Sequence, residues 1–159
     1  MQQMRQVREL IALAMLTVSS YTDIREKCIY LFPVAICTAG AVALTVTSYF
    51  FSSVTEAGEV LLWELLSPAA TGILLIIVVK AGKAHIGEGD GYLTAALWMI
   101  LGLRAGIYSV IAGLFILLAA SLVILISGRR RVHRLIPFAP FILAGYLSVL
   151  IYEIFRENL

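Results

Sequence analysis

Charged residues are scarce in this chain. Of its 159 residues, 14% are charged and 61% are hydrophobic, and the mean hydropathy is +0.97. Soluble domains are typically about 25% charged and about 45–50% apolar, so the composition excludes an ordinary soluble domain. The net charge is only +2 and no long basic face occurs, so we expect no nucleic-acid partner. The composition predicts an integral membrane protein whose main partner is the lipid bilayer.

Residues typical of metal and redox sites are also few. The chain contains two cysteines, Cys28 and Cys37, and two histidines, His85 and His133. Neither pair has the spacing of a metal-binding motif, so we predict no metal site and no cofactor.

Long apolar runs make up most of the remainder, and a membrane span needs about 20 apolar residues. Six such runs predict an all-α, polytopic membrane protein with about six transmembrane helices, in a single domain over residues 1–159. Arg104 marks a tight turn between the fourth and fifth helices, and no internal repeat is evident. The expected helices cover roughly residues 7–22, 29–51, 61–79, 92–103, 105–126 and 135–155.

The distribution of lysine and arginine predicts the orientation. Eight of these residues fall in the first, third and fifth connections, against four on the opposite side. Cytoplasmic loops of membrane proteins carry the excess of positive residues. We therefore predict a multi-pass protein of the cell membrane, with these three connections in the cytoplasm and both chain ends outside. The cytoplasmic residues are Arg25, Lys27, Lys80, Lys83, Arg129, Arg130, Arg131 and Arg134.

The two aspartates of the chain both fall on the predicted cytoplasmic side. Asp23 ends the first expected helix, and Asp90 begins the fourth. Ionisable side chains next to hydrocarbon are costly, and they usually mark functional sites. Structural roles are the alternatives: Asp23 could pair with Arg25 or Lys27, and Asp90 could cap the start of its helix.

Two carboxyl groups that share one proton can hydrolyse a peptide bond. One activates water and the other protonates the leaving amine, because nearby like charges split the two pKa values. A helix dipole favours an anion at the helix N-terminus and a neutral acid at the C-terminus. The sequence therefore predicts Asp90 as the base and Asp23 as the acid.

A glycine-rich stretch, Gly87-Glu88-Gly89-Asp90-Gly91, surrounds the second aspartate. Gly87 and Gly89 can adopt positive φ angles, which would let an extended substrate strand pair with the backbone. The alternative is an ordinary turn between helices, where glycine is common. Because the following helix is short, we also expect the two carboxyl groups to be apart in the resting state.

Three segments resemble the motifs of the type IV prepilin peptidases, membrane aspartyl proteases that remove leader peptides from pilin precursors. Gly87-Glu88-Gly89-Asp90 resembles their GxGD motif, and Asp23-Ile24-Arg25-Glu26-Lys27-Cys28-Ile29 is similar to their first aspartate motif. Ile136-Pro137-Phe138-Ala139-Pro140-Phe141 is similar to the Pro-Phe-x-Pro segment before their last helix. The motifs occur in the family's order. The chain departs from the family at Tyr30 and Leu31, usually Pro and Asn, and at Tyr92, usually Lys.

The resemblance implies a GxGD aspartyl protease fold and a hydrolase with Asp23 and Asp90 as catalytic residues. The implied substrate is a prepilin-like membrane protein, of the Flp/Tad or archaeal type, with a short basic leader and an apolar helix. The short, peptidase-only form is expected, and methyltransferase activity receives no support. The residues implied to bind substrate are Gly87, Glu88, Gly89, Gly91, Pro137, Phe138 and Pro140.

Two other functions use the same features. The aspartates could serve a small proton- or cation-coupled transporter subunit, or the chain could be a non-catalytic partner in pilus assembly. A transporter needs polar residues through the depth of the bilayer, and the second, fifth and sixth expected helices contain few. The sequence indicates no particular oligomeric state.

Overall fold

The computed structural model describes residues 2–50, 57–81, 87–126 and 136–157. This part of the chain is entirely helical, without a β-strand, so the predicted all-α class is confirmed. The helices are α1 (Gln2–Glu26), α2 (Leu31–Phe50), α3 (Ala57–Ala81), α4 (Glu88–Leu101), α5 (Leu103–Ile126) and α6 (Ala139–Glu157).

Several helix boundaries differ from the sequence prediction. α1 continues to Glu26, so Asp23 lies in its last turn. α4 begins at Glu88, inside the glycine-rich stretch, because acidic side chains in a first turn favour a helix start. α6 begins only at Ala139, and Pro140 follows in its first turn, where a proline is tolerated because its missing N–H would have no partner within the helix. The break between α4 and α5 is at Gly102, which has φ 83°, and Arg104 already belongs to α5.

Four helices are long and apolar enough to cross a membrane: α2, α3, α5 and α6. α4 has 14 residues and is about 21 Å long, less than the roughly 30 Å of a hydrocarbon core. α1 is longer but contains charged side chains, among them Arg5, Arg8 and Glu9. Large apolar side chains point outward from the spanning helices; Phe32 is 76% exposed and Ile126 is 83% exposed. These features identify a membrane-embedded protein.

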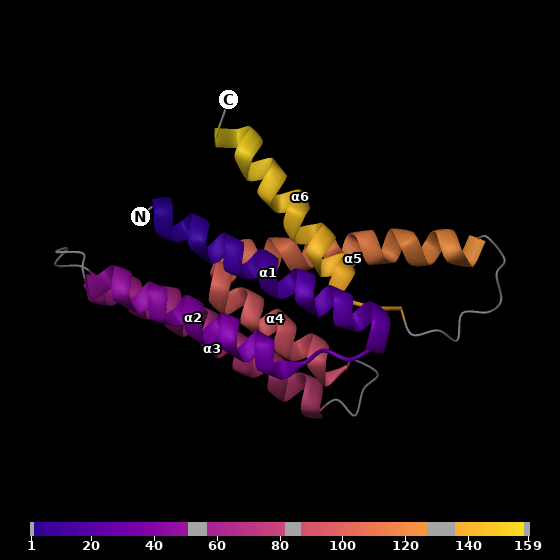
Figure 1. Ribbon diagram of the computed structural model, residues 1–159, viewed down its shortest axis with the longest axis horizontal. Helices are drawn as coiled ribbons and strands as arrows, with labels where there is room; N and C mark the ends of the chain where they lie inside the picture. Colours follow the sequence, from indigo (N-terminus) through magenta and orange to yellow (C-terminus); the bar gives the residue numbers. More distant parts are fainter. Residues whose placement is uncertain (1, 51–56, 82–86, 127–135, 158–159) are drawn as a thin grey trace.

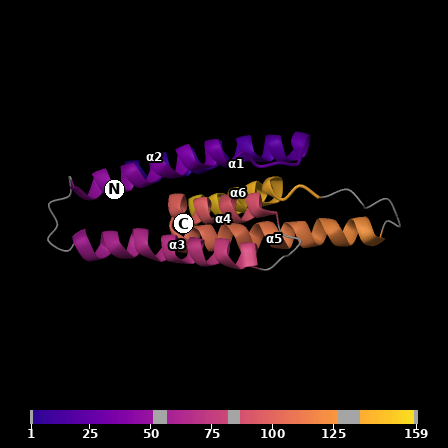
Figure 2. The same cartoon turned by 90° about the horizontal axis from the view of Figure 1, so that it is seen from below.

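α4 lies at the centre of the bundle. It contacts α1, α2, α3 and α5, while α6 packs against α5 and α1. Figure 2 shows α4 and α6 between a layer formed by α1 and α2 and a layer that contains α3 and α5. In Figure 1, α5 extends beyond the other helices at the end where α1 finishes and α6 begins. Other helices cover the sides of α4. Its short length therefore does not expose it to lipid.

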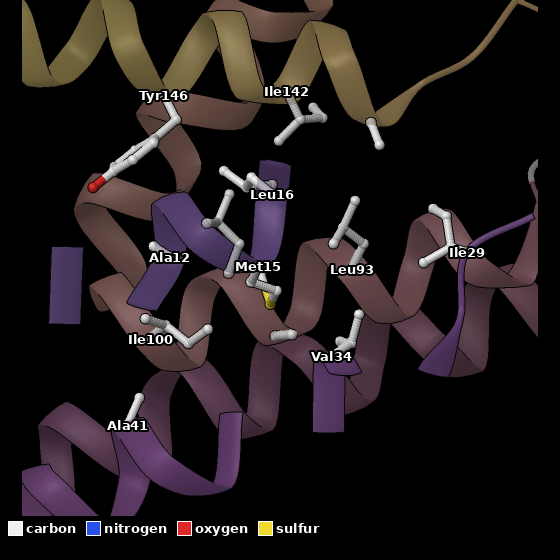
Figure 3. Close-up of a cluster of buried hydrophobic side chains, with 13 residues drawn as sticks. Ala12, Met15, Leu16, Ile29, Val34, Ala41, Leu93, Ile100, Ile142 and Tyr146 are labelled. Carbon is white, nitrogen blue, oxygen red and sulfur yellow. The ribbon is translucent and has the colours of Figure 1, made fainter. Parts of the chain in front are cut away.

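The core is apolar and is formed where α1, α2, α4 and α6 meet. Met15 and Leu16 of α1 are almost completely buried, as are Leu93 and Ile100 of α4 and Ile142 of α6. Figure 3 shows these side chains filling the space between the helices. Residues three and four positions apart share one face of a helix, so the buried stripe of α1 continues from this core to Asp23.

Polar contacts connect the helices at the end of the bundle opposite Asp23. Arg8 Nε donates a hydrogen bond of 2.7 Å to the Ile100 carbonyl oxygen near the end of α4. The last carbonyl groups of a helix lack partners within the helix, so Arg8 satisfies one of them and fixes α4 against α1. Arg5 forms an ion pair with Glu153 of α6. The first turn of α1 and the last turns of α6 therefore lie at one end of the bundle, as predicted.

α5 and α6 cross at closely packed glycines. A Cβ atom added at Gly113 would lie 2.7 Å from the Phe141 carbonyl oxygen, and one added at Gly145 would overlap the backbone of α5. Small residues allow two helix backbones to approach this closely. The crossing therefore depends on the absence of side chains at both positions.

The Gly145→Ala variant should be less stable than the wild type, because the added methyl group forces the backbones of α5 and α6 apart. Overpacking of this kind costs about 1–3 kcal/mol, which corresponds to a fall of several degrees in Tm for a chain of this size. Thermal unfolding in detergent micelles measures the effect. Gly40→Ala is the matched control, since no heavy atom lies within 4 Å of a Cβ there. Equal Tm values for the two variants would contradict the crossing.

Candidate active site

Asp23 is held by the start of another helix. It is 7% exposed, and its Oδ2 atom accepts a buried hydrogen bond of 2.9 Å from the backbone N–H of Ala139. Ala139 is the first residue of α6, whose N–H has no partner within the helix. The next residue, Pro140, has no N–H, and Phe141 donates to the Phe138 carbonyl oxygen at 3.1 Å. Asp23 thus completes the hydrogen bonding of the first turn of α6.

The simpler structural role for Asp23 does not fit this geometry. Among the described residues, Ala139 is the only hydrogen-bond donor to Asp23, and the side chain forms no ion pair with Arg25 or Lys27. Both cations are exposed, and the Arg25 guanidinium lies 5.1 Å from the centre of the Tyr21 ring. Asp23 is therefore directed into the bundle rather than toward its basic neighbours.

Asp90 does not act as the cap of α4. The N-cap residue is Gly87, and Asp90 is the third residue of the helix. Its carboxyl group folds back beside Gly87, where an added Cβ atom would lie 3.2 Å from Oδ2. Within the described part of the chain, the Asp90 side chain forms no hydrogen bond and no ion pair.

Asp90 is close enough to Asp23 for the charge of one to affect the other. Burial first, and the negative charge of Asp23 second, together raise the pKa of Asp90 from 3.8 to about 6. Asp90 lies in the first turn of α4, outside the four candidate spans. In the described part of the chain, no hydrogen bond joins the two side chains.

The assignment of base and acid to the two aspartates stays a prediction. The backbone N–H of Ala139 at the start of α6 gives Asp23 a hydrogen-bond donor. The raised pKa of Asp90 favours its protonated form. The prediction considered only the helix that carries each aspartate. It therefore missed that Asp23, at the C-terminus of α1, reaches the N-terminus of α6.

The glycines of the motif serve packing rather than an unusual backbone conformation. Gly87 has φ −59°, and Gly102 is the positive-φ glycine of the described residues, so the prediction of positive φ at Gly87 and Gly89 was wrong. A Cβ atom added at Gly89 would lie 3.1 Å from Ile29, and one at Gly91 would lie 3.2 Å from Val79. The small residues let the first turn of α4 contact the connection after α1 and the end of α3. These contacts bring Asp90 toward Asp23.

The other predicted site residues lie at the starts of α4 and α6. Glu88 is exposed at the start of α4, whereas Pro137, Phe138 and Pro140 are partly buried at the start of α6. Lys80 of α3 lies 5.7 Å from the centre of the Tyr92 ring. The preceding connection, residues 82–86, and the basic connection, residues 127–135, lie outside the described residues.

Sequence reasoning missed the groups that position the aspartates. These are the backbone N–H of Ala139, the Ile29 and Val79 side chains, and Arg8 at the far end of α4. The Pro-Phe-x-Pro pattern was a usable signal, because prolines commonly mark a helix start with unpaired N–H groups. In the described ranges, no group of three or more His, Cys, Asp or Glu side chains could hold a metal ion.

No protein-family model, curated protein or solved structure matches this chain. The arrangement of the two aspartates is therefore the main evidence from which a function can be inferred.

The Asp90→Asn variant should change how stability depends on pH. Asp90 has a pKa of about 6 in the folded protein and an ordinary value of 3.8, so the folded state binds more protons between these values. Stability therefore falls as pH rises through this window and stays lower above it. Asn removes the titrating group, so the variant should have a higher Tm than the wild type at about pH 8 and a similar Tm at about pH 4.

Glu88→Gln is the matched control for this measurement, because Glu88 is an exposed acid in the same turn of α4. The difference in Tm between Glu88→Gln and the wild type should be the same at about pH 8 and at about pH 4. A pH-independent difference for Asp90→Asn would show that the Asp90 carboxyl group is not desolvated.

Proposed function

We propose that this chain is a membrane aspartyl endopeptidase that removes the short basic leader from a prepilin-like precursor at the cytoplasmic face of the cell membrane. The main support is the interaction between Asp23 and Asp90, which lie on helices far apart in the sequence. The three motifs that resemble the prepilin peptidases include both aspartates and the segment that begins α6.

In this proposal the two aspartates have complementary protonation states. The Asp23 carboxylate takes a proton from water, whose oxygen attacks the carbonyl carbon of the scissile peptide bond. Asp90 gives its proton to the leaving nitrogen as the carbon–nitrogen bond breaks. Asp23 then carries the proton and Asp90 is ionised, and transfer of that proton back to Asp90 restores the starting state.

The proposal includes a GxGD protease fold with six membrane crossings, in which α1 and α4 are the two inner helices. α4 contacts four other helices, and the buried stripe of α1 faces the core, so neither needs the apolar surface of a lipid-facing span. Glu88 lies between Gly87 and Gly89 and is exposed. Its charge can therefore attract the basic leader of a substrate. The excess of lysine and arginine supports a cytoplasmic position for this end.

A transporter that uses the same aspartates receives less support. Beyond Asp23 and Asp90, the centre of the described bundle is formed by Met15, Leu16, Leu93 and other apolar side chains. Among the described residues no continuous row of polar groups leads from the aspartates to the opposite end. Proton or cation passage needs such a path.

The Asp23→Asn and Asp90→Asn variants should each lose cleavage of a co-expressed prepilin, because each removes one half of the acid–base pair. We expect a loss of at least about a hundredfold, since general acid–base catalysis contributes about 10²–10⁴. The shift of the precursor to its shorter product on a gel measures cleavage, and membrane fractionation checks insertion.

Glu26→Gln is the control for the cleavage assay, since Glu26 is an exposed acid near Asp23 that accepts a hydrogen bond from Tyr30. It should process the precursor at the wild-type rate. Continued processing by either aspartate variant would rule out the proposed mechanism.

The cleavage rate should also fall at high pH. Because Asp90 must be protonated and its pKa is about 6, the rate should decline by about tenfold per pH unit above that value. Purified protein in liposomes, assayed with a synthetic precursor peptide between pH 5 and about pH 8, measures this dependence. A rate that rises with pH over this range would assign the proton donor to another group.

A further inference from the structure

Two buried side-chain polar atoms lack a hydrogen-bond partner among the described residues: Ser20 Oγ and Trp98 Nε1. Trp98 packs against Gly106 where α4 meets α5, at the end of α4 away from Asp90. Ser20 is 5% exposed and lies on α1, close in sequence to Asp23. Because an unpaired buried hydroxyl group costs free energy, its retention needs a specific explanation.

Ser20 also differs from most other hydroxyl residues in these helices. Thr17, Thr45 and Ser109 each donate to the carbonyl oxygen four positions earlier in their own helix, at 2.7–2.9 Å. This bond satisfies a hydroxyl group that has no other partner. Ser20 does not form it with Leu16, so its hydroxyl group is available to a group outside its own backbone.

Asp23 is a buried acceptor on the same face of α1 as Ser20. Ser20 lies three positions before Asp23 on the same buried stripe of α1, and residues at this spacing are neighbours on a helix surface. Helical side chains lean toward the N-terminus, so the Asp23 carboxyl group lies over the turn that contains Ser20. Its Oδ2 atom is bonded to Ala139, which leaves Oδ1 for a second donor.

We propose that Ser20 is a positioning residue for Asp23: the Ser20 hydroxyl group donates a hydrogen bond to one bridging water molecule, which donates to Oδ1 of Asp23. Donors on α1 and α6 would then hold the two oxygens of Asp23 and fix the plane of the carboxylate. A fixed carboxylate directs its remaining lone pairs at one position, where the attacking water must sit. The effect on catalysis rests on the proposed peptidase function, whereas the hydrogen bond itself does not.

The Ser20→Ala variant should lower kcat for a precursor peptide by about tenfold to a hundredfold, because loss of the donor misplaces the base. KM should stay within about twofold of the wild type, since substrate contacts are unchanged. Ser20→Thr keeps the hydroxyl group and should restore most of kcat. Thr45→Ala is the control: it removes a buried hydroxyl that is bonded within α2, and kcat should not change.

A second measurement tests the hydrogen bond without activity. Because the chain has two aspartates, ¹³C labelling of aspartate side chains gives two carboxyl signals in nuclear magnetic resonance, and Asp90→Asn leaves only that of Asp23. Ser20→Ala should shift this remaining signal, whereas Thr45→Ala should not.

The outcomes separate this proposal from the proposed function. Wild-type kcat in Ser20→Ala, with both Asp→Asn variants inactive, would overturn the role of Ser20 and leave the peptidase intact. An unchanged Asp23 signal in Ser20→Ala would also overturn it. Full activity of both Asp→Asn variants would instead refute the peptidase, and a shifted Asp23 signal would still support the hydrogen bond.

Discussion

The hydrogen bond between Asp23 and the N–H of Ala139 is the interaction on which the site depends. It joins the last turn of α1 to the first turn of α6, two segments from opposite halves of the chain. Both groups are buried, so neither can exchange its partner for bulk water without cost. The bond therefore fixes where Asp23 lies.

The location of Asp90 follows from packing rather than from hydrogen bonding. α4 is central and short, and its first turn fits between neighbours only because Gly89 and Gly91 have no side chains. Burial of the Asp90 carboxyl group raises its pKa. Among the described residues, Asp23 has a hydrogen-bond donor and the Asp90 side chain has none.

The sequence was sufficient to predict the helical class, the two aspartates at one end of the bundle, and the chain ends at the other. Hydropathy predicts the helices. The alternating direction of successive helices predicts which of their ends lie together. It was not sufficient for the functions of the glycines or for the hydrogen-bond partner of Asp23. Gly89 packs closely against Ile29, and Asp23 accepts a hydrogen bond from Ala139. Such contacts join residues far apart in the chain, and no local pattern records them.

The single residue between α4 and α5 has a consequence for distant parts of the molecule. Gly102 joins the two helices directly, so the end of α4 and the start of α5 are adjacent. α5 packs closely against α6 where Gly113 and Gly145 meet. The N–H of Ala139, the first residue of α6, donates a hydrogen bond to Asp23. A continuous series of contacts therefore leads from Asp90 through α4, α5 and α6 to Asp23. The spacing of the two carboxyl groups is therefore set by the whole bundle, including positions far from either acid.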